Sequence, residues 1–152
     1  MSINTVRNYL NGMNHGPNHY YALAINRTWF DLKERDNNDE NIHPYHLYIR
    51  YDSNISEFMV GVYFGTPPRR QAALATAMNR LAAIQQAMQN DARWAGICQV
   101  LHTPANWGAI PGGRNITTYL GFHFDNPNGN QPPTQPQLAA IKDLVDLIFE
   151  NF

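Results

Sequence analysis

The stretch Tyr45-His46-Leu47-Tyr48-Ile49-Arg50-Tyr51 carries the clearest strand pattern in the chain. Its odd-numbered residues are apolar or aromatic, whereas its even-numbered residues His46, Tyr48 and Arg50 are polar. Successive side chains of a strand point to opposite faces of a sheet. We therefore expect one face of this strand to be buried and the other to be displayed.

The rest of the chain divides into segments of strand and helix periodicity. Alternating or β-rich apolar runs predict further strands over residues 20–25, 28–35, 58–65, 96–101 and 116–125. Helical spacing of apolar residues predicts helices over residues 2–13, 66–90 and 135–152. The short connections favour antiparallel neighbours. The sequence thus predicts a single α+β domain over residues 1–152 in the order α-β-β-β-β-α-β-β-α, with a mainly antiparallel sheet of about five to six strands and helices packed on one face.

Composition excludes several classes of function. The net charge of −1 argues against general nucleic-acid binding, which needs a basic excess. A single cysteine, Cys98, excludes an internal disulfide and a cysteine-based zinc site. The sequence shows neither a signal-peptide pattern nor a long apolar run, so we expect a cytoplasmic protein that does not enter a membrane. We also expect no metal and no cofactor.

Histidines occur on two predicted strands, in His46-Leu47-Tyr48 and His123-Phe124-Asp125. Imidazole titrates near neutral pH, so two of them can act as acid and base across a phosphodiester. This arrangement is loosely similar to the two-histidine phosphoesterases, which repeat His-x-Thr/Ser on two strands. The chain departs from that pattern at the third positions, where Tyr48 and Asp125 replace the small hydroxyl residue. His46 and His123 are the catalytic candidates if the protein is an enzyme.

The predicted helix start at Thr66 offers a second feature. Arg69 and Arg70 fall in its first turn, where free N–H groups and guanidinium groups favour an anion. Trp107 lies on a glycine-containing loop, either as a binding hot spot or as the anchor of its own loop. Tyr119 belongs to the last predicted strand, beside His123, and adds an aromatic residue to the displayed face of the predicted sheet.

Two polar segments have ordinary interpretations. His15 and His19 flank Gly16-Pro17, which interrupts any helix, so we expect solvent-exposed loop histidines. Residues 36–41 are acidic and rich in Asn but lack the ligand order of a calcium loop, which favours a solvated loop.

The leading hypothesis is a small binding or inhibitor protein that neutralises a partner protein such as a toxin or a defence component. Its contact residues are expected in the aromatic and basic set favoured at interfaces: Tyr48, Arg50, Arg69, Arg70, Trp107 and Tyr119. The alternative is a nucleotide- or phosphodiester-handling protein that uses the arginines for phosphate and the histidines for catalysis. The same His/Tyr/Arg row also suits an ordinary solvent face of a sheet.

Overall fold

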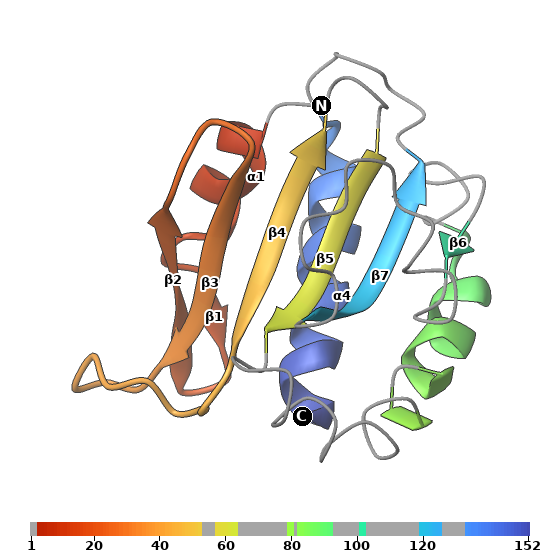
Figure 1. The fold of residues 1–152 in the computed structure, drawn as a ribbon. Helices are drawn as coiled ribbons and strands as arrows, with labels where there is room; N and C mark the ends of the chain where they lie inside the picture. The colour runs from red at the N-terminus through yellow and green to blue at the C-terminus, as the bar shows by residue number, and fades with distance from the viewer. Residues whose placement is uncertain are drawn as a thin grey trace.

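The computed structural model describes residues 3–52, 57–63, 79–80, 82–92, 101–102, 119–125 and 133–152 of the chain. For residues 51–52, 57–58, 101–102 and 119–125 it describes the backbone only. The arrangement is α+β, with an antiparallel sheet and helices packed against it (Figure 1). Arg69, Arg70, Trp107 and Cys98 lie outside the described residues.

The described helices and strands follow the predicted order closely. Their bounds are α1 (Ile3–Leu10), β1 (Asn14–His15), β2 (Asn18–Ala24), β3 (Trp29–Arg35), β4 (His46–Asp52), β5 (Glu57–Tyr63), β6 (Leu101–His102), β7 (Tyr119–Asp125) and α4 (Gln135–Asn151). Residues 82–89 are also helical, within the helix predicted for 66–90.

The sheet has the strand order β1-β2-β3-β4-β5-β7-β6 among the described residues. Every described strand pair is antiparallel, which confirms the expected meander from β2 to β5. The predicted strand over 96–101 overlaps β6 at Leu101, and residues 96–100 lie outside the described residues. The sheet therefore has seven described strands rather than five or six, because the two-residue strand β1 at one edge was not predicted.

The strand β1 corrects the expectation of a loop around His15. Asn14 pairs with His19 and His15 pairs with Asn18, which leaves Gly16-Pro17 as a two-residue hairpin turn. Gly16 has a φ of 59°, a value that side-chain-bearing residues rarely adopt and that such turns require at their first central position. The helix α1 has already ended at Leu10, so the Gly-Pro sequence forms the turn that starts the sheet.

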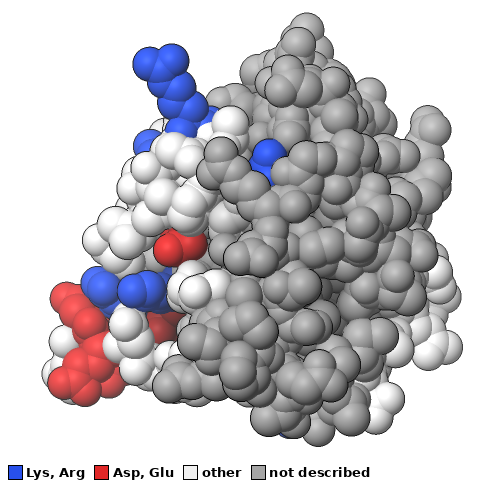
Figure 2. Space-filling model, viewed as in Figure 1, with Lys and Arg blue, Asp and Glu red and all other residues white. Residues whose placement is uncertain are grey.

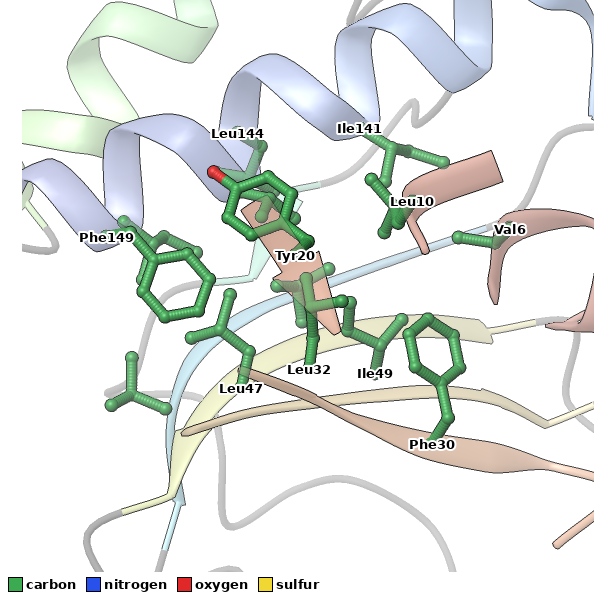
Figure 3. Close-up of a cluster of buried hydrophobic side chains, with 14 of the residues drawn as sticks. Val6, Leu10, Tyr20, Phe30, Leu32, Leu47, Ile49, Ile141, Leu144 and Phe149 are labelled. Carbon is green, nitrogen blue, oxygen red and sulfur yellow. The ribbon is translucent and has the colours of Figure 1, made fainter. Parts of the chain in front are cut away.

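The core lies between one face of the sheet and the helices α1 and α4 (Figure 3). Leu47 and Ile49 of β4 are fully buried there, as their alternation predicts, together with Val60 and Val62 of β5. Each such aliphatic side chain contributes about 1.5–3 kcal/mol through burial. The covered face of the central strand is therefore the one that its sequence indicates.

Local side-chain hydrogen bonds fix two element ends. The Asn26 carboxamide oxygen accepts from the backbone N–H groups of Thr28 and Trp29 at 2.8 and 3.1 Å, which forms the predicted hairpin turn between β2 and β3. Thr134 caps α4, and the side-chain oxygen of its partner Gln137 accepts a hydrogen bond from the Thr134 N–H at 2.8 Å. Both the hairpin turn and the helix cap are formed by residues within three positions of one another in the sequence.

Candidate functional site

The polar residues of β4 lie on the face of the sheet away from α1 and α4. In the backbone register His46 is opposite Tyr63, Tyr48 is opposite Gly61 and Arg50 is opposite Met59. The neighbouring strand β3 adds Trp29 opposite Arg50 and Asp31 opposite Tyr48. Figure 1 views the sheet from this face.

The centre of this face is less accessible than its polar composition suggests. Tyr48 and Met59 each expose only 8% of their surface. The ring of Trp29 lies over that of Tyr48, with 4.8 Å between the ring centroids. Tyr48 therefore packs against Trp29 and has little exposed surface for direct contact with a partner.

Two of the three exposed large apolar residues in the described part of the chain lie farther out, on β2 and its turn to β3. Leu23 exposes 38% of its surface and Ile25 exposes 42%. Leu23 is opposite Asp31 in the ladder, so it shares the face of Trp29. The accessible apolar surface thus lies at the end of the β2–β3 hairpin.

His46 is partly buried and engaged within the protein. Its Nε2 lies 3.4 Å from Oδ1 of Asp31, an ion-pair distance that is longer than an ordinary hydrogen bond. Its ring packs against Tyr63 at 4.8 Å. These contacts hold the imidazole against the sheet.

The register separates the two catalytic candidates. His123 is opposite Met59, which is opposite Arg50, so His46 lies two strands away and four residues farther along. At about 3.3 Å per residue and about 4.8 Å per strand, the Cα atoms of His46 and His123 are about 16 Å apart. Tyr119, not His123, shares a row with His46 through Tyr63. The backbone register therefore does not place the two histidines side by side, as joint acid–base catalysis on one phosphodiester bond would require.

A second polar group lies on the covered side of the sheet, and sequence patterns did not reveal it. We call it the Glu34 cluster: His15, Glu34, His43 and Glu150. Glu34 is 4% exposed, a rare environment for a carboxylate. One of its oxygens contacts Nδ1 of His15 and the other lies 2.7 Å from Nε2 of His43. Nε2 of His15 lies 2.8 Å from Glu150 of α4.

Aromatic rings enclose this cluster. Phe149 of α4 stacks on Tyr20 at 5.3 Å and on His43 at 5.2 Å. Tyr45 packs against both His43 and Phe149, with ring centroids 4.9 and 5.9 Å apart. The rings limit the access of water to the Glu34 cluster and fix the orientation of His43.

Tyr20 extends the polar network toward the middle of α4. Its hydroxyl donates to Oδ1 of Asp146 at 2.5 Å, and Lys142 contacts the other oxygen of Asp146 at 2.7 Å. Figure 3 shows the Tyr20 hydroxyl turned toward α4. Burial, with the nearby Asp146 carboxylate, raises the pKa of Tyr20 well above its ordinary value. The phenol therefore remains a hydrogen-bond donor.

One sequence signal points to Glu34. Phe30 and Leu32 occupy alternate core-facing positions of β3, and Glu34 continues their series. An acid at such a position must find partners inside the protein. Its partners His15 and His43 are 19 and 9 residues away along the chain, and neither distance corresponds to a strand or helix period that would reveal the contact.

The described residues contain no group of three or more His, Cys, Asp or Glu side chains arranged to hold a metal ion. No helix within the described ranges is long and apolar enough to cross a membrane. No known protein-family model, curated protein or solved structure matches the chain.

Proposed function

We propose that this chain is a protein-binding domain that meets its partner at the end of the β2–β3 hairpin. The surface concerned is the hairpin patch, defined as Leu23, Ile25, Arg27, Trp29 and Arg50. The exposure of Leu23 and Ile25 beside Trp29 is the observation that carries the proposal.

The composition of the hairpin patch favours contact with another protein. Leu23 and Ile25 are two of the three large apolar residues that are exposed in the described part of the chain. Trp and Arg are enriched among the residues that contribute most to protein interfaces. Tyr48 lies beneath Trp29 and restricts its movement, so Trp29 would lose little conformational freedom on binding.

Charge indicates the chemistry of the partner. The hairpin patch has two arginines and borders one acid, Asp31, which lies opposite Leu23 and has a side chain that is 16% exposed, whereas Asp36, Asp39 and Glu40 lie in the turn at the opposite end of β3. Figure 2 shows basic atoms at one of these ends, acidic atoms with basic atoms beside them at the other, and a smaller acidic patch between the two. A protein surface with an apolar centre and acidic residues around it complements this patch. Inhibition of that partner is the form of binding that the sequence favours.

A photo-crosslinking residue at position 23 tests the proposal in the cells that express the protein. Ile42 provides a matched control, since it is 40% exposed and lies beyond the opposite end of β3. We expect one protein to be captured from position 23 and not from position 42. Equal capture from both positions would overturn the proposal.

Substitutions then test the charge argument. Leu23→Glu should abolish capture of the partner by repelling its acidic residues, while Leu23→Lys should weaken it less. Ile42→Glu should have no effect. If Leu23→Glu leaves capture unchanged, the hairpin patch is not the contact surface.

The nucleotide-handling alternative gives a different outcome. A nucleotide that binds the folded chain raises its melting temperature, by several degrees at saturating concentration. We expect no such shift across a panel of nucleotides. A shift that disappears in the His46→Ala variant would favour the alternative over protein binding.

A further inference from the structure

His15 has carboxylate oxygens at both of its ring nitrogens. Nδ1 faces Glu34 and Nε2 faces Glu150 at 2.8 Å. An ionised carboxylate only accepts hydrogen bonds, and a neutral imidazole has one N–H to donate. Both contacts are satisfied together when His15 is an imidazolium that donates from both nitrogens.

Glu150 lies in the last turn of α4, where a negative charge opposes the helix dipole. That turn contains no basic residue of its own. His15 places a cation there from β1, on the other side of the core. The contact therefore joins the C-terminal turn of α4 to the edge of the sheet.

We propose that His15 is a charged latch that holds the last turn of α4 to the sheet, and that the latch opens as the pH rises. When His15 loses one proton, one of its two contacts loses its donor. Glu34 is buried and keeps a second partner in His43, whereas the side chain of Glu150 is 54% exposed and can return to water. The contact with Glu150 is the one that breaks.

The groups around His15 come from every neighbouring element. Glu34 and Tyr20 face it from β3 and β2, and Glu150 and Asp146 face it from α4. His43 and Tyr45 lie beyond Glu34, Lys142 neutralises part of the Asp146 charge, and Arg80 lies over Phe152. Acidic groups thus predominate in contact with the imidazole.

These surroundings raise the pKa of His15 above its ordinary value of 6.5. Burial is the largest single effect and lowers the pKa, but the hydrogen bonds to Glu150 and Glu34 and the charges of Glu34 and Asp146 together outweigh it. A raised pKa in the closed state means that the latch is strongest below pH 6.5 and is lost as the pH rises through the pKa of the closed state.

Nitrogen NMR of the histidine side chains tests the charge directly on the unmodified protein. At pH 6, both ring nitrogens of His15 should give the signals of a protonated imidazolium. Signals of a neutral tautomer at that pH would overturn the proposal. This measurement does not depend on whether any variant folds.

Amide hydrogen exchange tests the opening. The Phe152 N–H donates to the Ile148 carbonyl at 3.1 Å and reports on the last turn of α4, while the Leu138 N–H reports on the first. After correction for base catalysis of exchange, the opening constant at Phe152 should rise about tenfold per pH unit between the open-state and closed-state pKa values of His15. It should stay constant at Leu138.

Two variants separate the latch from general destabilisation. His15→Gln removes the titrating group, so the pH dependence at Phe152 should disappear. His19→Gln is the matched control, because His19 also contacts a carboxylate, that of Asp39 at 3.1 Å, away from α4. It should retain the pH dependence. The same pH dependence in His15→Gln as in the unmodified protein would overturn the proposal.

Discussion

Tyr20 lies directly opposite Glu34 in the ladder between β2 and β3, and both side chains are buried under α4. Two adjacent polar groups in a core are tolerated only when each has a partner. Tyr20 donates to Asp146 of α4, and Glu34 accepts from His15 and His43. The C-terminal helix and this part of the sheet are therefore joined by polar contacts as well as by apolar packing.

Removal of the Glu34 carboxylate should destabilise the protein strongly. Glu34→Ala leaves His15 and His43 without their shared acceptor, and loss of one partner of a buried charged pair costs about 3–5 kcal/mol. Urea unfolding measures this loss. Glu40→Ala, at an exposed acid six residues farther on, should change stability by less than about 0.5 kcal/mol. Equal effects of the two substitutions would show that the Glu34 contacts are not formed.

The hydroxyl of Tyr20 should contribute measurably to stability. Tyr20→Phe removes the donor to Asp146 and should cost about 1.5–3 kcal/mol, the range for a hydrogen bond to a charged group. Tyr21→Phe is the matched control, since Arg35 contacts the face of the Tyr21 ring at 3.8 Å and the substitution preserves the ring. Unfolding curves for the two variants should differ clearly, and coincident curves would contradict this prediction.

Alkaline pH should unfold the protein through its buried tyrosines. Burial raises the pKa of both Tyr20 and Tyr45 above the ordinary value of 10, with additional raising effects from Asp146 at Tyr20 and Glu34 at Tyr45. Because the folded state holds these phenols neutral, their contribution to stability is present below pH 10 and is lost as the pH rises above it.

The ultraviolet absorbance of phenolate measures this titration. Of the eight tyrosines, Tyr20 and Tyr45 should ionise only in a step that coincides with the loss of folded structure. Circular dichroism recorded in parallel follows that loss. Ionisation of all eight near pH 10 in a protein that remains folded would show that the two rings are accessible to solvent.

Much of the fold follows from local periodicity. The alternation of Leu47 and Ile49 with His46 and Tyr48 correctly assigned the covered face of β4. The spacing of Ile3, Val6 and Leu10 likewise correctly identified the buried side of α1. Periods of two and of 3.6 residues are set by backbone geometry alone, so they can be read without knowledge of the neighbours.

The Glu34 cluster could not be predicted in this way. His15 belongs to a strand of two residues, too short for any alternation to appear. Glu150 of α4 contacts His15 from a position 135 residues away in the chain, and His43 contacts Glu34 from the irregular segment before β4. The burial of individual residues on the uncovered face could not be predicted either. Tyr48 has the polar character of a surface residue and yet is buried.

Two leucines on neighbouring strands should respond differently to truncation. Leu32 of β3 is fully buried in the core, and Leu32→Ala should cost about 2–5 kcal/mol through lost burial and the cavity left behind. Leu23 of β2 is exposed on the hairpin patch, and Leu23→Ala should stay within about 0.5 kcal/mol of the unmodified protein. Thermal unfolding distinguishes the two. A large loss from Leu23→Ala would place that side chain in the core instead.

The first turn of α4 should depend on its capping residue. The Thr134 hydroxyl accepts from the Gln137 N–H, and the Gln137 side chain accepts from the Thr134 N–H, so each supplies the other with a partner. Thr134→Ala removes the first of these bonds and should cost about 1 kcal/mol, whereas Thr134→Ser keeps a hydroxyl and should cost little. Urea unfolding measures the loss, and amide exchange at Leu138, whose N–H donates to the Thr134 carbonyl, locates it. If α4 were anchored by its C-terminal contacts alone, both substitutions would leave exchange at Leu138 unchanged.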